Sequence, residues 1–324
     1  MEEWQAQMVT CLAHEEAKNL RVEEALAIKY DHRPNSVFKY RQVDDWSLQN
    51  LENDCVWVCS PTDYNDPYDS SISITSETLT SSIVQDGVKE LIKQGLDKDL
   101  DTERLKALLA AENPAIALQE ALLGQDQIPP EFWPPFIAAF EEQVQQWKQA
   151  VKELLPGSHK DSLKVCSFSG TVDSIIMWSH YADQHRGFSI EYDLQVLPPE
   201  NLFVRMLYPV IYSDALFDAT RYYLAALRDR PGFNILFPAL ASLYKSPEWS
   251  YEREWRLVIP AGLVKEPSRW RVPKPKCLHL GSRMNAEQRD KVLAIARKRD
   301  IEVYQTFLAE DSFSLRSEPA YAHS

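Results

Sequence analysis

The sequence predicts an α+β fold, and three observations lead to this prediction. Short runs of β-type sequence, such as SVFKYR at 36–41 and FSIEYD at 188–193, are separated by helical stretches of very unequal length. This spacing differs from the regular β-α repeat of a doubly wound fold. With 44% hydrophobic residues, the chain of 324 residues can also bury a sizeable core.

Two helical regions define the expected domain organisation. Residues 1–30 carry apolar side chains at helical spacing and stop at the polar breaker DHRPNS, which indicates an N-terminal helical segment. Residues 79–156 are helical in pattern, with a turn marked by the proline pairs of QDQIPPEFWPP. We therefore expect residues 31–324 to form a single α+β domain that contains a helical insertion at about 79–156.

The composition restricts which ligands the protein can bind. The formal net charge of -13 argues against generic binding to duplex nucleic acid, although residues 265–299 hold eleven Lys or Arg against three Asp or Glu. This basic stretch is either a solvated face or a surface for an anionic ligand. Only nine glycines occur, where typical usage gives about 23. Neither G-x-x-x-x-G-K nor G-x-G-x-x-G is present, so side chains have to hold any bound nucleotide.

The five cysteines and the apolar runs bear on where the protein works. The cysteines are scattered and include no C-x-x-C pair, which argues against a disulfide framework and against a structural zinc site. The N-terminus lacks the pattern of a secretory signal, and no stretch approaches the roughly 20 apolar residues of a membrane span. We expect a cytoplasmic protein with reduced thiols and no membrane partner.

The segment YEREWRLVIP at 251–260 contains the most suggestive charged residues. Strand alternation sends Glu252, Glu254 and Arg256 to one face, and Trp255 and Leu257 to the other, which is core. Two carboxylates beside an arginine can keep one carboxylate ionised while it polarises a hydroxyl group. The alternative is a half-exposed strand that carries a surface ion pair.

Polar residues also gather around aromatic ones at other strand ends, as in a ligand cleft. Lys39 and Arg41 share one face of the strand FKYR, and YNDPYDSS at 64–71 follows the apolar run CVWVCSP. In SIIMWSHYADQHRGF the residues His180, Asp183 and His185 invite a metal interpretation. Their spacing does not put all three on one helical face, so we expect no metal there.

Several of these segments together resemble the bacterial family DUF2971, a domain of unknown function. The similar pieces are FKYR, VWVCSPTDYNDPYD, CSFS, MWSHYADQHRGFSIEYD, YEREWRLVI and LHLGS, in that order. They span residues 36 to about 283 and leave out the first 30 residues and the helical block at 79–156. The family name implies no activity.

A second, weaker resemblance is to the ADP-ribosyltransferase fold, through FKYR, SLQNLEN, VWVCSP and YEREWRL. It implies a mixed or antiparallel central sheet, NAD as substrate, and Glu254 and Glu252 as the catalytic pair, with Glu254 accepting a hydrogen bond from the ribose 2′-hydroxyl. The first strand offers no His, which departs from the pattern of that fold. The residues that it implies for binding the nucleotide are Lys39, Tyr40, Arg41, Ser60, Tyr64, Asn65, Asp66, Tyr68, His180, Tyr181 and Arg256.

Three functions stay open on the sequence. The first is an NAD-consuming enzyme that transfers ADP-ribose to a protein or nucleic acid, or hydrolyses NAD, as a bacterial toxin or antiphage effector. The second is a metal-dependent nuclease, in which Asp66 or Asp69 and the two glutamates bind Mg²⁺. The third is a non-catalytic sensor or recognition protein that uses the same pocket.

Overall fold

The computed structural model describes residues 1–76, 159–227, 232–264 and 266–320, together with isolated positions between 78 and 153. The chain divides into two compact units. Unit 1 comprises residues 1–71, 159–217 and 234–324, and unit 2 comprises residues 72–158 and 218–233. Apart from isolated positions, the helical insertion expected at about 79–156 lies outside the described residues.

Unit 1 is built around a mixed sheet of eight strands, which confirms the α+β class and the mixed central sheet. The strand order is β14-β13-β12-β5-β1-β4-β10-β6. Among the described ladders of this sheet, β12 and β13 pair in parallel and the others are antiparallel. The bounds are β1 Ser36–Arg41, β4 Leu163–Ser169, β5 Phe188–Asp193, β6 Leu207–Pro209, β10 Glu254–Pro260, β12 Cys277–Leu280, β13 Glu302–Leu308 and β14 Leu315–Pro319.

Short strands complete the described β-structure. In unit 1, β2 (Cys55–Val58) pairs with β11 (Ser268–Arg271), and β7 (Ile211–Tyr212) pairs in parallel with β9 (Tyr244–Lys245). The strands β3 (Ile72–Ser73) and β8 (Phe217–Asp218) lie where the chain passes from one unit to the other.

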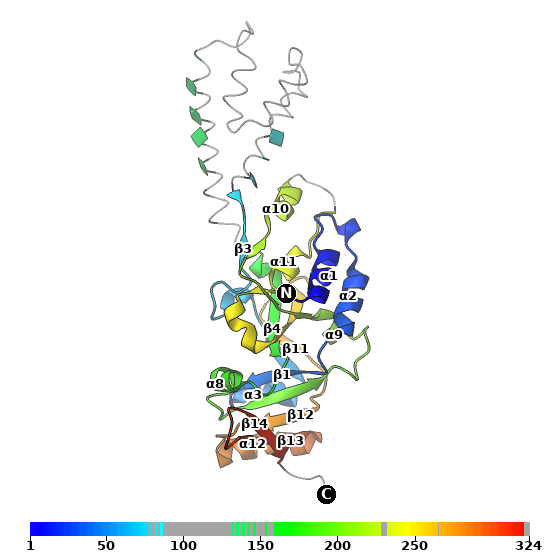
Figure 1. The fold of residues 1–324 in the computed structure, drawn as a ribbon, viewed down its shortest axis with the longest axis vertical. Helices are drawn as coiled ribbons and strands as arrows, with labels where there is room; N and C mark the ends of the chain where they lie inside the picture. The colour runs from blue at the N-terminus through cyan, green and yellow to red at the C-terminus, as the bar shows by residue number, and fades with distance from the viewer. Residues whose placement is uncertain are drawn as a thin grey trace. The chain divides into compact units, whose positions relative to one another are not determined.

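Helices flank the sheet of unit 1 (Figure 1). The expected N-terminal helical segment is a pair, α1 and α2, that lie side by side, while α8 lies beside β1 and α12 beside β13. The helices are α1 Glu3–Leu12, α2 Val22–Asp31, α3 Asp45–Glu52, α8 Ile175–Tyr181, α9 Leu202–Met206, α11 Phe237–Ala241 and α12 Ala286–Arg299, with α10 Thr220–Leu227 in unit 2. Short 3-10 helices are η1 Ala17–Asn19, η2 Pro61–Asp63, η5 Lys160–Ser162 and η6 Pro247–Glu252.

The core of unit 1 follows from strand alternation. Phe188, Ile190 and Tyr192 of β5 point to one face and join the main hydrophobic cluster with Leu278 and Leu257. On the other face of the same strand lie Ser189 and Glu191, which are buried polar residues. At β5 the sheet therefore has one face in the main hydrophobic cluster and one face that buries polar side chains.

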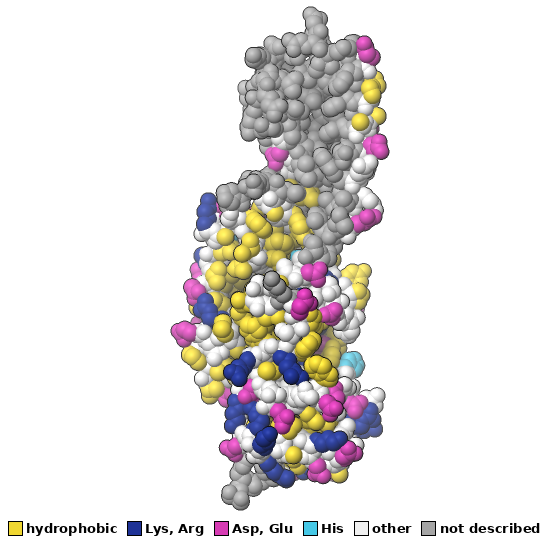
Figure 2. Space-filling model, turned by 180° about the vertical axis from the view of Figure 1, so that it is seen from behind, with side chains coloured by type: hydrophobic (Ala, Val, Ile, Leu, Met, Phe, Trp, Pro, Cys, Tyr) yellow, Lys and Arg dark blue, Asp and Glu magenta, His cyan; other side chains and the backbone are white. Residues whose placement is uncertain are grey.

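The basic stretch at 265–299 is partly a mixed, solvated surface. Figure 2 shows Lys and Arg side chains interspersed with Asp and Glu over the end of unit 1 that carries β12, β13 and α12. In α12 the basic residues Arg297, Lys298 and Arg299 occupy the last turn, where they complement the helix dipole. None of the helices in the described ranges is both long enough and apolar enough to cross a bilayer.

Candidate functional site

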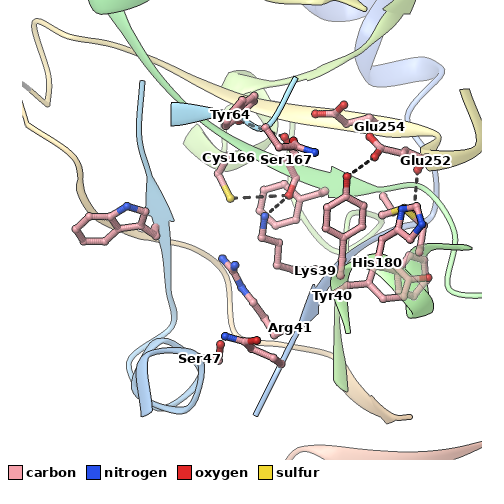
Figure 3. Close-up of a pocket in the computed structure, with 18 of the residues that line it drawn as sticks. Lys39, Tyr40, Arg41, Ser47, Tyr64, Cys166, Ser167, His180, Glu252 and Glu254 are labelled. Atoms are coloured by element: carbon pink, nitrogen blue, oxygen red, sulfur yellow. Dashed lines mark hydrogen bonds between the residues drawn. The ribbon is translucent and has the colours of Figure 1, made fainter. Parts of the chain in front are cut away.

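A cavity of about 610 Å³ in unit 1 is called the main cavity below. Its size falls in the range of roughly 300–1,000 Å³ typical of small-molecule sites. Strands β1 and β4, helix α8 and the segment from η6 into β10 supply most of its wall (Figure 3). Nine predicted site residues line it, namely Lys39, Tyr40, Arg41, Tyr64, Asn65, His180, Tyr181, Glu252 and Glu254.

Four predicted site residues lie elsewhere. Asp66 and Tyr68 line a second cavity of about 510 Å³, and Tyr68 is 70% exposed. Ser60 is buried and caps η2, where its hydroxyl accepts from the Thr62 amide. Arg256 is 0% exposed and lies behind the cavity wall. For these four residues, the predicted direct contact with a ligand of the main cavity lacks support.

The strand alternation predicted for YEREWRLVIP is wrong at its first residues. Glu252 is the last residue of η6, Arg253 adopts a left-handed conformation with φ 46°, and β10 begins only at Glu254. Both faces of β10 are buried from Glu254 to Ile259, so the alternative of a half-exposed strand with a surface ion pair is wrong as well. The left-handed residue turns the two glutamates onto different parts of the site.

Glu254 belongs to a buried ionic group, called here the Arg256 cluster, that consists of Asp69, Lys245, Glu254 and Arg256. Arg256 holds Asp69 with two parallel bonds of 2.7 and 2.5 Å and donates from Nε to Glu254 Oε1 at 2.7 Å. Lys245 Nζ donates to Glu254 Oε2 at 2.8 Å. Bidentate arginine pairs of this kind are strong and directional.

The Arg256 cluster determines the charge of Glu254. Burial by itself raises the pKa of this carboxyl, but the guanidinium of Arg256 and the ammonium of Lys245 outweigh burial and hold the pKa below its usual value. The position between Asp69, Glu252 and Glu254 is occupied by Lys245 Nζ, at 3.7, 2.6 and 2.8 Å. A nuclease that binds Mg²⁺ through these carboxylates would need that position for the metal ion.

Glu252 has a different environment, although it is only 4% exposed. Its Oε1 accepts from the Tyr181 hydroxyl at 2.7 Å and its Oε2 from Lys245 at 2.6 Å. Burial raises the pKa of Glu252 above its usual value, in spite of the nearby Lys245. A carboxylate has about four acceptor positions. Two recorded bonds leave Glu252 with spare capacity toward the cavity, whereas Glu254 already accepts three.

The wall across from the glutamates supplies positive charge. Lys39 and Arg41 reach from β1 into the space beside Cys166 and Ser167 (Figure 3). Lys39 Nζ donates to the Ser167 carbonyl at 2.5 Å, and burial lowers the pKa of this amine. Tyr64 stands close by, with its hydroxyl 3.2 Å from Ser167 Oγ. Two cations and an aromatic ring therefore face the same space.

Tyr40, by contrast, anchors the fold. Its ring makes an edge-to-face contact with Trp178 at 5.2 Å, and its hydroxyl donates to the Thr171 carbonyl at 2.8 Å. This contact fixes α8, the helix that carries His180 and Tyr181, against β1. Tyr40 thus positions the cavity wall rather than offering its hydroxyl to a ligand.

The turn after α8 explains how MWSHYADQHRGF builds one side of the cavity. Asp183, Gln184 and His185 all have positive φ, and Gly187 follows. A Cβ atom on Gly187 would lie 2.1 Å from the Arg41 carbonyl oxygen, so only glycine allows this loop to approach β1. Asp183 forms a salt bridge with Arg186 at 2.8 Å, and the ring of His185 stacks on Trp178.

Sequence reasoning missed several residues of the site. Lys245 comes from β9, whose pairing with β7 places Tyr212 opposite it, and no motif marks this lysine. The sequence indicates Asp69 only as a candidate metal ligand. Trp57, Cys59, Cys166 and Ser167 also line the main cavity. All five cysteines are free, and burial raises the pKa of Cys59 to about 11, which makes it a poor nucleophile.

Comparison with known proteins gives one match. The family model described as "Protein of unknown function (DUF2971)" matches residues 177–257, a quarter of the chain. This match bears out the predicted resemblance to DUF2971 over residues 177–257. The DUF2971 segment contains His180, Tyr181, Lys245, Glu252 and Glu254, so it supplies the glutamate side of the main cavity. No curated protein and no solved structure matches the chain, and the resemblance to ADP-ribosyltransferases stays a prediction.

Proposed function

We propose that this DUF2971 protein consumes NAD, transferring ADP-ribose to a protein or nucleic acid or hydrolysing the nucleotide. Glu252 is the proposed catalytic carboxylate in place of Glu254. The protein would act in the cytoplasm, where NAD is available, as a toxin or antiphage effector.

A single arrangement carries this proposal. One cavity combines a hydrogen-bonded carboxylate at Glu252, two cations at Lys39 and Arg41, and the aromatic ring of Tyr64. A dinucleotide needs these groups together, since its pyrophosphate is anionic, its bases are planar, and its glycosidic bond breaks with positive charge on the ribose. The cavity volume of about 610 Å³ suits a ligand of this class.

The chemistry follows from where charge develops. The bond between the ribose C1′ and the nicotinamide nitrogen breaks, and its electron pair leaves with nicotinamide. The oxocarbenium-like ribose is then attacked by a nucleophilic group of the acceptor, or by water, which loses a proton. Glu252 stabilises the positive charge that exists only in the transition state. Tyr181 and Lys245 orient its carboxylate, while Arg41 holds the pyrophosphate.

A second candidate is a sensor that binds the nucleotide without chemistry. The observation in its favour is that Glu254, the carboxylate that the ADP-ribosyltransferase resemblance makes catalytic, accepts three bonds inside the Arg256 cluster. If catalysis requires an accessible Glu254, the main cavity would bind the nucleotide without turning it over. The two candidates share the ligand and differ in turnover.

The test is incubation with NAD labelled in the nicotinamide and, separately, in the adenine, with protein and nucleic-acid acceptors present. We expect nicotinamide release by the wild type, and a fall of about 100-fold in Glu252→Gln, as found when one transition-state contact is removed. Glu200→Gln, an exposed matched control, should behave as the wild type. Stabilisation by NAD without release would favour the sensor. Neither binding nor release by folded protein would contradict both candidates.

A further inference from the structure

A second group of chemically active side chains lies outside the main cavity, on the face of β5 that buries Ser189 and Glu191. Glu191 of β5 is directly opposite Cys277 of β12 in the antiparallel ladder, and His279 follows Cys277 by two residues on the same face. All three residues are buried. Two adjacent strands therefore present a carboxylate, a thiol and an imidazole at one place.

The ligand atoms of the three side chains converge. Glu191 Oε2 lies 3.1 Å from Cys277 Sγ and 3.0 Å from His279 Nε2, and the sulfur and the nitrogen are 3.4 Å apart. A tetrahedral zinc ion with ordinary bond lengths separates such atoms by about 3.3–3.6 Å. The triangle is thus within a few tenths of an ångström of one face of a zinc coordination polyhedron.

The geometry differs from that of a nucleophilic triad. In a triad the histidine uses one ring nitrogen for the nucleophile and the other for the carboxylate. Here His279 Nε2 faces both Cys277 and Glu191, while Nδ1 is buried without a partner among the described residues. Convergence on a common point is what a cation requires.

The surroundings supply a second shell. The outer oxygen of Glu191, Oε1, accepts from Ser36 Oγ at 2.7 Å and from Lys276 Nζ at 2.9 Å, so the carboxylate is fixed with Oε2 turned toward the other two ligands. Metal-binding carboxylates are usually held in this way. A carboxylate, a thiolate and a divalent cation bound to further neutral ligands carry no net charge, so the site needs no additional counter-ion, and the role of Lys276 is to hold Glu191 Oε1.

A partner for the free ring nitrogen is close at hand. Ser189 is paired with His279 in the strand register, and its Oγ is fully buried without a hydrogen bond to any described residue. When a metal ion occupies Nε2, Nδ1 carries the proton and requires an acceptor. Rotation of the Ser189 side chain would provide one.

We propose that Glu191, Cys277 and His279 bind a zinc-class divalent cation, with water in the remaining coordination position. None of the three residues lines the main cavity, and the ion would link β5 to β12. This inference revises the expectation of no metal, which rested on the absence of a Cys-x-x-Cys pair, whereas Cys-x-His on one strand face serves the same purpose.

The test uses the full chain, purified without chelators. We expect about one zinc per chain by elemental analysis, and a Tm that falls by several degrees after chelation and recovers on adding zinc. Cobalt(II) added to the metal-free protein should give a thiolate charge-transfer band and the intense visible bands of tetrahedral coordination. Cys277→Ser should lose the thiolate band, and Cys55→Ser, a half-exposed control, should keep it.

Two results would overturn the proposal. One is metal-free protein whose Tm is unchanged by either chelator or zinc. The other is a cobalt spectrum without the thiolate band, or with a band that Cys277→Ser retains. If Cys277→Ser fails to fold, a variant that lacks Cys55 and Cys59, the two partly exposed thiols, but keeps Cys277 still decides the question through its cobalt spectrum.

Discussion

The two glutamates of the Glu-x-Glu segment are two residues apart, but their hydrogen-bond partners differ and their pKa values are shifted in opposite directions. Glu254 is enclosed with Arg256, Asp69 and Lys245, and its pKa is lowered by these cations in spite of burial. Glu252 is bound by Tyr181 and Lys245 at the cavity wall, and burial raises its pKa. The comparison teaches that Glu254 is held by three bonds inside the Arg256 cluster, whereas Glu252 accepts two and is the carboxylate that we propose for chemistry, with Lys245 bonded to both.

The largest effect should come from removing the cation at the centre of the Arg256 cluster. Arg256→Met removes the guanidinium that holds both Asp69 and Glu254 and leaves Lys245 as the one cation of the cluster, and breaking buried pairs in this way costs about 3–5 kcal/mol. The Tm should fall by roughly 10 °C for a domain of this size. Calorimetry checks this, with the exposed Arg271→Met as the matched control. A change no larger than that of the control would mean that the cluster contributes little to stability.

The pH dependence of stability separates the two carboxylates. Because the pKa of Glu254 is lowered on folding, its stabilisation is present above the ordinary value of 4.5 and is lost as pH falls below it. The pKa of Glu252 is raised, so its contribution is present below 4.5 and is lost as pH rises through the folded-state value.

Measurement of Tm from about pH 3 to about pH 7 tests these signs. Glu254→Gln should flatten the acid limb, and Glu252→Gln should reduce the loss of stability on the neutral side. The same flattening in both variants would show that the carboxylates titrate as one unit, and would contradict the opposite pH dependence that we assign to them.

The cations across the cavity should affect ligand binding and leave stability unchanged. Arg41→Gln removes a charge that faces the main cavity, and we expect about a tenfold weaker affinity for NAD, equivalent to about 1.4 kcal/mol. Calorimetric titration at two salt concentrations measures the effect, which should shrink at high salt. Arg271→Gln, at an exposed position of β11, serves as the control. Equal affinities of the two variants would remove Arg41 from the binding site.

The smallest effect concerns the tuning of Glu252. Its bond from the Tyr181 hydroxyl favours the ionised carboxylate, so Tyr181→Phe should raise the pKa of Glu252 further. The acid limb of the rate of nicotinamide release should therefore move to higher pH, with a smaller change in the maximal rate. Tyr304→Phe, whose hydroxyl contacts only Glu302 in the described hydrogen bonds, should leave the profile in place. An unmoved acid limb in Tyr181→Phe would mean that Glu252 does not govern the profile.

The periodicity of apolar residues predicted much of the fold, because a strand or helix that buries one face repeats apolar residues at a fixed spacing in the sequence. The runs SVFKYR and FSIEYD coincide with β1 and β5. The prediction failed at Glu252, because the left-handed conformation that follows it is adopted by an arginine, Arg253. A glycine or asparagine there would have indicated such a conformation. Tertiary contacts, rather than local preference, impose that conformation.

The candidate site was predicted in part for the same reason. Residues within the quoted motifs, such as Lys39 and Tyr181, do line the main cavity. The Arg256 cluster was not foreseen, since Asp69 and Arg256 are 187 positions apart and Lys245 belongs to no motif. The group of Glu191, Cys277 and His279 is visible in the sequence only as a Cys-x-His pair, Cys277 and His279, on one face of a strand.

The measurement that tests the division between the two glutamates most directly is the rate of nicotinamide release by Glu252→Gln and by Glu254→Gln, each per folded molecule and below its own Tm. The account predicts a fall of about 100-fold for Glu252→Gln with little loss of stability. It predicts a lowered Tm for Glu254→Gln, with release per folded molecule within about tenfold of wild type. The reverse pattern, in which Glu254→Gln is folded, stable and inactive while Glu252→Gln retains activity, would contradict it.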